Sequence, residues 1–218
     1  MRCLFCKNDS SSSRSREHII PESLGNQSHV LPPGVVCDGC NNYFARKVEA
    51  PFLSSGAVLA TRHTQAIVNK RGIVPPLDVV VSPGVRGVLY HDDEPGSPFT
   101  KILDLPAEAA THIIRTGGGS MVLPVHPEPP PDEMVSRFLA KAALEAIAAR
   151  VLRAFGTTDA IVDDPMLDPL RLHARRRTPP AWPFSLRRVY DPNHRFVDPD
   201  GTAYQRLFEY DLFFTDTP

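Results

Sequence analysis

Four cysteines, placed in two pairs near the N-terminus, restrict how this chain can fold. Cys3 and Cys6 form one CxxC pair, Cys37 and Cys40 form a second, and 30 residues separate the two pairs. Paired CxxC doublets are typical of a tetrahedral zinc site in a reducing compartment, whereas disulfides require an oxidising one. A redox-active CxxC is the other alternative, but that motif is single and lies beside a βαβ pattern. The cysteines therefore predict a Cys₄ zinc site that closes a long loop.

The loop between the two pairs contains residues that could carry out chemistry. The strand-like pair Ile19-Ile20 ends at Pro21 and places Glu17 and His18 on opposite faces or at a strand end. The segment from Cys40 to about Leu53 has the pattern of a helix with Asn41 in its first turn. If zinc joins the two CxxC pairs, Asn41 is held beside the metal. Glu17 and Asn41 can then converge as oxygen ligands next to His18. One carboxylate and one amide oxygen suit a hard cation such as Mg²⁺, which keeps several water ligands.

Five sequence blocks occur in an order that resembles a known family. They are Cys3-x-x-Cys6, Glu17-His18-Ile19-Ile20-Pro21, Leu24-Gly25, Cys37-x-x-Cys40 and the adjoining Asn41. This order resembles the zinc-stapled branch of the HNH endonucleases, which are ββα-metal (His-Me finger) nucleases, and the resemblance covers about residues 1–53. Glu17 stands where the wider family most often has Asp, and Asn26 stands where the family usually has a second Gly.

The resemblance implies a role for each matched residue. His18 is expected to be the general base that activates water, and an imidazole ordinarily titrates close to neutral pH. Glu17 and Asn41 are expected to hold one catalytic divalent ion, Mg²⁺ or Mn²⁺, where negative charge grows on the scissile phosphate. The four cysteines are expected to bind a separate zinc ion that is purely structural.

Each of these residues also has a simpler interpretation. His18 could be an ordinary strand histidine, and Asn41 could simply cap the helix that begins near it. Asn42 is the alternative ligand if Asn41 is only a cap. Arg46, one helical turn beyond Asn42, could reach a phosphate or lie on a solvated helix face.

The remaining residues predict a mixed α and β region. The 23 prolines of the whole chain favour short elements. We expect strands near residues 77–81, 85–90, 100–105, 121–125 and 204–214, and helices near 56–70, 107–115 and 133–155. In the last helix, Asp132 is the expected N-cap. Lys141 and Glu145 are expected to form a surface pair. The expected core positions of this helix are Val135, Phe138, Leu139, Ala142, Ile147, Val151 and Phe155. The expected fold is α+β: a ββα-metal HNH module at residues 1–55 and an α/β region of unassigned role at 56–218.

A local charge imbalance lies in the C-terminal region, although the formal net charge is only −1. Between Arg171 and Arg195 there are seven arginines and a single acid, and Arg175, Arg176 and Arg177 are consecutive. Such a segment can bind nucleic-acid phosphates. Alternatively, the arginines pair with the acidic stretch that includes Asp159, Asp163, Asp164 and Asp168.

These observations predict a metal-dependent endonuclease that hydrolyses phosphodiester bonds. DNA is the expected substrate, and a bacterial or phage restriction or defence system is a setting that fits such an enzyme. The alternative is a zinc-stabilised nucleic-acid-binding protein that lacks catalysis. No run of 18 apolar residues suggests a membrane span, and the polar N-terminus lacks a signal-peptide core, so a cytoplasmic location is expected. The expected strand at 204–214 would suit a contact with a second copy or with a partner protein.

Overall fold

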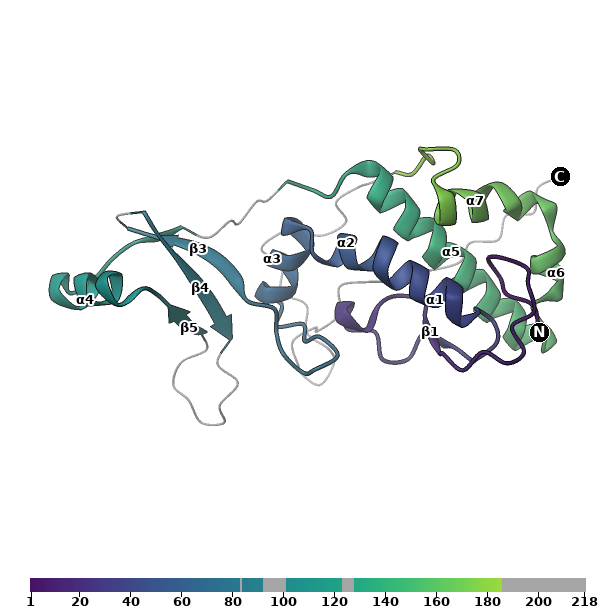
Figure 1. The fold of residues 1–218 in the computed structure, drawn as a ribbon, viewed down its shortest axis with the longest axis horizontal. Helices are drawn as coiled ribbons and strands as arrows, with labels where there is room; N and C mark the ends of the chain where they lie inside the picture. Colours follow the sequence, from purple (N-terminus) through teal and green to yellow (C-terminus); the bar gives the residue numbers. More distant parts are fainter. Residues whose placement is uncertain (83, 92–100, 123–127, 186–218) are drawn as a thin grey trace. The chain divides into compact units, whose positions relative to one another are not determined.

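The computed structural model describes residues 1–82, 84–91, 101–122 and 128–185 (Figure 1). The chain divides into two compact units: residues 1–54 together with residues from 130 onward, and residues 55–129. The α+β class predicted from the sequence is confirmed. The independent folding of residues 1–55 as a domain stays a prediction, and the expected strand at 204–214, with its contact to another chain, lies outside the described residues.

The N-terminal part of the first unit is a two-stranded hairpin followed by a helical segment. Strands β1 (Glu17–His18) and β2 (Val30–Leu31) are antiparallel, with Glu17 opposite Leu31 and His18 opposite Val30. The helical segment consists of α1 (Asp38–Phe44), a π-helical stretch η2 (Ala45–Glu49) and α2 (Ala50–Leu53). It begins two residues before the expected start, because the Cys37 side chain caps α1 by accepting a hydrogen bond from the backbone N–H of Cys40.

The long predicted helix is present and completes the first unit. Helix α5 (Asp132–Phe155) begins after Pro131, so Asp132 lies in the first turn and is not the N-cap. It ends at Gly156, whose φ of 73° suits glycine. It is followed by α6 (Asp159–Asp163) and α7 (Asp168–Arg176), and α7 lies alongside α5 (Figure 1). Within the described ranges, no helix has both the length and the apolar character needed to cross a membrane.

Burial along α5 differs from the sequence-based expectation. Phe138 and Ala142 are buried as predicted, but Leu139 is 43% exposed and Phe155 is 74% exposed, so their assignment to the core is wrong. The core surface of α5 consists largely of small side chains, namely Ala140, Ala142, Ala146 and Ala148. Small residues let neighbouring helices approach closely, and Phe138 stacks on Phe52 with ring centroids 4.2 Å apart.

The second unit, in its described residues, is a four-stranded antiparallel sheet with two helices. The strand order is β5-β4-β3-β6. The elements are α3 (Gly56–Thr64), β3 (Leu77–Val81), β4 (Val85–His91), β5 (Lys101–Asp104), α4 (Ala107–Thr116) and β6 (Met121–Val122). Helix α3 is shorter than predicted, since the backbone leaves the helical region at Ala66, where φ is 54°. Alternate residues of β3 and Leu89 of β4 form the core of this unit.

Candidate functional site

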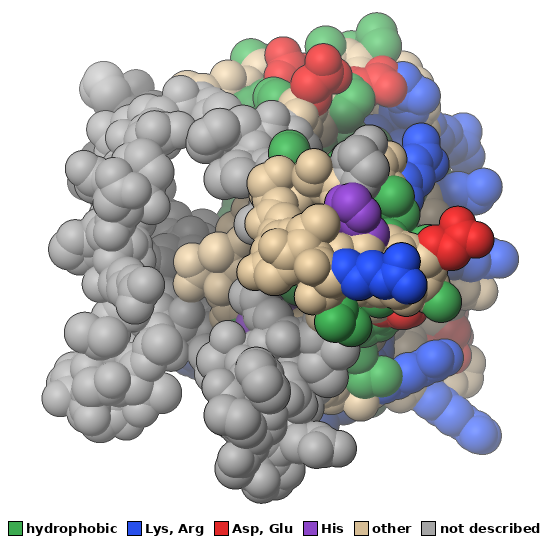
Figure 2. Space-filling model, turned by 90° about the vertical axis from the view of Figure 1, so that its left-hand side faces the viewer, with side chains coloured by type: hydrophobic (Ala, Val, Ile, Leu, Met, Phe, Trp, Pro, Cys, Tyr) green, Lys and Arg blue, Asp and Glu red, His purple; other side chains and the backbone are tan. Residues whose placement is uncertain are grey.

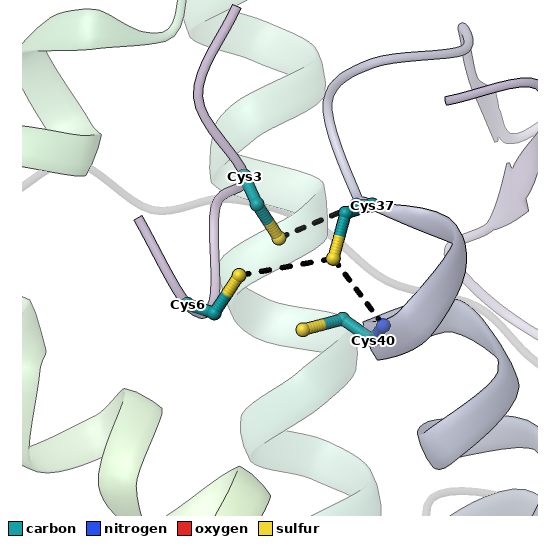
Figure 3. A group of neighbouring side chains, drawn as sticks. All are labelled: Cys3, Cys6, Cys37 and Cys40. Atoms are coloured by element: carbon teal, nitrogen blue, oxygen red, sulfur yellow. Dashed lines mark hydrogen bonds between the residues drawn. The ribbon is translucent and has the colours of Figure 1, made fainter. Parts of the chain in front are cut away.

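The four cysteines form one cluster although they come from two distant segments. Cys3 and Cys6 lie in the N-terminal loop, Cys37 precedes α1 and Cys40 is in its first turn, and the four Sγ atoms point toward one another (Figure 3). All four sulfurs lie within 4.8 Å of one another, and the Sγ atoms of Cys6 and Cys37 are 3.7 Å apart. Tetrahedral Zn–S bonds of about 2.3 Å give sulfur separations of roughly 3.8 Å. The cluster therefore suggests a structural zinc site.

Backbone N–H groups donate hydrogen bonds to two of the four cysteine sulfurs. The N–H of Cys37 donates to Cys3 Sγ at 3.3 Å, and the N–H of Cys40 donates to Cys37 Sγ at 3.4 Å. Zinc binds the thiolate form, which such donors stabilise. A hydrogen bond from the Cys40 thiol, together with backbone N–H donors at Cys37, Cys6 and Phe5, lowers the pKa of Cys3 to about 4 despite burial. The donor set thus fits zinc in both number and chemistry.

Hydrogen bonds join the start of α1 to the segment that enters β1. The Asp38 carboxylate accepts from the backbone N–H of Ser15 at 2.9 Å and from its hydroxyl at 2.6 Å, which lowers the pKa of Asp38. The Asn41 side chain donates from Nδ2 to the backbone carbonyl of Arg16 at 3.1 Å. Asn41 is therefore fastened to the residue that directly precedes Glu17. With Nδ2 used in this bond, Oδ1 is the atom of Asn41 that suits a cation.

Asn26 holds the loop of the β1–β2 hairpin in place. Its side chain is fully buried and donates from Nδ2 to the carbonyls of Ile20 at 2.6 Å and His29 at 3.0 Å. Its Oδ1 accepts from the backbone N–H groups of Ser28 and His29. The amide therefore makes four hydrogen bonds that hold both ends of the loop, a role that the sequence analysis did not predict.

A buried lysine from α5 contacts the strand that carries the candidate catalytic residues. The Nζ atom of Lys141 lies 2.7 Å from Glu17 Oε1, and it donates to the backbone carbonyl of His18 at 2.9 Å. It also lies 2.7 Å from Glu49 Oε1 and 2.9 Å from Glu145 Oε2. The side chains of Lys141 and Glu145 are both 0% exposed, so the prediction of a surface pair is wrong.

The charges in this cluster depend on one another. Burial acts to lower the pKa of Lys141, but the nearby charges of Glu145, Glu17 and Glu49 outweigh it and raise that pKa, so the ammonium stays charged. Burial raises the pKa of Glu145 well above its usual value. A buried charge is tolerated only when it is paired and hydrogen-bonded. The three carboxylates and the His18 carbonyl supply those partners for Lys141.

The predicted nucleic-acid-binding residues have different surroundings. Arg46 and Arg176 are exposed, Arg175 is half-buried, and Arg177 forms an ion pair with Glu133. Figure 2 shows Lys and Arg side chains of the described residues together with acidic and hydrophobic ones, and it labels none of these four arginines. A phosphate-binding role for these four arginines stays a prediction.

Arg171 belongs to the interior and not to a basic surface. Its Nε donates to the carbonyl of Leu4 at 2.8 Å, and its Nη1 lies 2.6 Å from Asp168 Oδ1. The acidic stretch also receives ion pairs from the N-terminal loop, at 2.7 Å between Arg2 and Asp163 and at 2.6 Å between Lys7 and Asp168. Part of the acidic stretch therefore fastens the cysteine-bearing loop to α6 and α7.

Comparison with known families agrees with this geometry. Residues 3–55 match the family described as HNH endonuclease. These residues belong to the HNH endonuclease family. The matched range contains all four cysteines, the β1–β2 hairpin and the helix with Asn41, and the resemblance inferred from the motifs is confirmed. Searches among curated proteins and among solved structures gave no match. For the described residues beyond the HNH module, the evidence for a role comes from their contacts with that module, above all those of Lys141 and Arg171.

Proposed function

We propose that this protein is a metal-dependent endonuclease that hydrolyses phosphodiester bonds, with DNA as its substrate. The observation that carries the proposal is the pairing of an HNH module with a complete set of candidate residues: Glu17 and His18 on β1, and Asn41 fastened beside them through the Arg16 carbonyl. If a nuclease had lost its catalytic activity during evolution, we would expect at least one of these side chains to have been replaced.

Each residue has a chemical role in this proposal. His18 accepts a proton from the water that attacks phosphorus. Glu17 and Asn41 supply one carboxylate and one amide oxygen, a donor set that fits Mg²⁺ or Mn²⁺. A divalent ion bound there supplies stabilisation of negative charge on the phosphate and on the leaving 3′ oxygen. The Cys₄ site supplies folding energy and no chemistry.

Basic side chains supply affinity for the substrate backbone in this proposal. Arg46 lies on the same helical segment as Asn41, and Arg175, Arg176 and Arg177 close α7, which packs in the same compact unit. Their contribution is electrostatic, independent of sequence and sensitive to salt.

One observation favours the alternative of a nucleic-acid-binding protein without catalysis. The Glu17 side chain is only 5% exposed and forms an ion pair with Lys141, whereas a metal ligand needs access to a hydrated ion. The two functions are distinguished by incubating zinc-loaded protein with supercoiled plasmid, linear duplex DNA, single-stranded DNA and RNA, each with Mg²⁺, Mn²⁺ or EDTA. We expect cleavage of DNA that needs the divalent ion. Tight binding without cleavage of any substrate would support the alternative.

A further inference from the structure

We propose that Lys141 is a positioning residue for the active site, which acts by holding the Glu17 carboxylate and the His18 backbone in place. This inference rests on the proposed nuclease function. It assigns to a helix outside the matched range of residues 3–55 a direct part in the geometry of the catalytic strand.

The first reason is the convergence of contacts on one atom. The Nζ atom of Lys141 touches the side chain of Glu17 at 2.7 Å and the main chain of His18 at 2.9 Å. One ammonium therefore restrains the proposed metal ligand through its carboxylate and the proposed base through its backbone. A carboxylate has several lone-pair directions, so this contact is compatible with cation binding by Glu17.

The second reason is that the ammonium is itself fixed. Lys141 is fully buried, and it is held by Glu145 one helical turn away on α5 and by Glu49 on η2. An exposed lysine on a flexible stem would position nothing, because its rotamers would remain free. Here the position of the ammonium is set by two helical segments that pack on each other.

The third reason concerns the residue type at position 17. Glutamate has one more rotatable bond than the aspartate that is common at this position in the wider family, and so more rotamer freedom to lose on ordering. A fixed cation at 2.7 Å removes that freedom before substrate binds. Glu17 and Lys141 are therefore expected to function as a unit.

The test distinguishes a role of Lys141 in positioning Glu17 and the His18 backbone from a role in binding the metal ion. Lys141→Met keeps an unbranched side chain of similar size and removes the charge. Mn²⁺ binding is measured from the EPR signal of free Mn²⁺, and cleavage of plasmid is measured at saturating Mn²⁺. Removing the Lys141 ammonium does not weaken the electrostatic attraction of the site for Mn²⁺. We therefore expect the affinity for Mn²⁺ to be kept or increased, while kcat falls at least tenfold. Glu17→Gln should instead lose Mn²⁺ affinity.

The matched control is Leu144→Ala, which truncates another fully buried side chain of α5 outside the cluster. It should lower thermal stability and leave both Mn²⁺ affinity and kcat unchanged. Circular dichroism shows whether Lys141→Met folds. If it does not, the triple variant Lys141→Met/Glu49→Gln/Glu145→Gln, which leaves fewer buried like charges, is expected to keep its Mn²⁺ affinity and to lose kcat in the same way.

Two results would overturn the positioning role. One is a folded Lys141→Met protein that cleaves at saturating Mn²⁺ within twofold of the wild-type rate. The other is a loss of rate that higher Mn²⁺ restores fully, because Lys141 would then act on ion binding alone. If the nuclease proposal itself is wrong, the wild-type protein will cleave no substrate, and this result differs from both of the outcomes above.

Discussion

The Nε atom of Arg171 donates a 2.8 Å hydrogen bond to the backbone carbonyl of Leu4, which lies between the first two cysteines. Helix α7 is thereby joined to the loop that presents Cys3 and Cys6. The Arg171 side chain is only 3% exposed and also bonds to the carbonyls of Asp164 and Ile161. The cysteine cluster of the HNH module is thus supported by residues more than 160 positions later in the chain.

This hydrogen bond predicts that Arg171→Met destabilises the protein and loosens zinc. Loss of a buried, charge-assisted hydrogen-bond network leaves carbonyls without donors, so we expect a loss of about 3 kcal/mol in the free energy of unfolding. Urea denaturation measures the stability, and chelator-induced release measures zinc retention. Arg176→Met, at an exposed position of the same helix, is the control and should change both by little. Equal effects of the two substitutions would contradict the structural role of Arg171.

The cysteine cluster predicts about one tightly bound zinc per chain. Elemental analysis of the purified protein measures it directly. Cys37→Ser should lower zinc content and unfold the N-terminal module, since a structural zinc site contributes folding free energy. A zinc-free wild-type protein that keeps the circular dichroism and thermal stability of the purified form would contradict this prediction.

The sequence predicted the elements that depend on local residue patterns or on the spacing of the cysteines. The cysteine cluster was predicted from the spacing of the two CxxC pairs, and the helix that follows was predicted from the residue pattern between Cys40 and about Leu53. Strand β3 was predicted as a strand-like run, and its side chains alternate between buried and exposed, although the exposed Val80 is apolar. The family resemblance added Glu17, His18 and Asn41.

The sequence could not predict contacts that depend on long-range packing. Lys141 and Glu145 have the i, i+4 spacing of an ordinary surface pair, and only the packing of α5 against β2 and η2 makes that face buried. Helix α7 was missed because the Asp168-Pro169 pair and the arginines suggest a charged loop, although proline is well accepted in the first turn of a helix. Arg171 was accordingly counted with the basic surface.

The arginines at the end of α7 predict a salt-dependent contribution to nucleic-acid binding. Replacing Arg175, Arg176 and Arg177 by alanine should weaken binding and reduce the slope of log K against log salt concentration by about 0.9 for each phosphate that is no longer neutralised. Fluorescence anisotropy over a salt series measures both quantities. Arg153→Ala, at an exposed position of α5, serves as the matched control. An unchanged slope in a folded triple variant would assign these arginines to structural roles, such as the ion pair of Arg177 with Glu133.

The ion pair between Glu17 and Lys141 predicts an unusual response to Glu17→Asp. Aspartate is the commoner residue in the wider family, yet its side chain is one methylene shorter and would withdraw from the Lys141 ammonium, now 2.7 Å away. We expect Glu17→Asp to lose at least tenfold in kcat. Asn41→Ala, which removes a proposed ligand together with the hydrogen bond to the Arg16 carbonyl, should recover part of its loss at high Mn²⁺. Wild-type activity in Glu17→Asp would show that Lys141 does not set the position of this carboxylate.

In the proposed nuclease His18 is the general base, and the variant His18→Ala tests this role. The substitution removes the imidazole but leaves the His18 carbonyl that accepts from Lys141, the ligands Glu17 and Asn41, and the four cysteines. The variant should therefore fold, retain zinc and bind both Mn²⁺ and DNA. Its rate of plasmid cleavage at saturating Mn²⁺ should fall by about 10²–10⁴-fold, the usual range for loss of a general acid or base. Cleavage by His18→Ala at the wild-type rate would contradict the assignment.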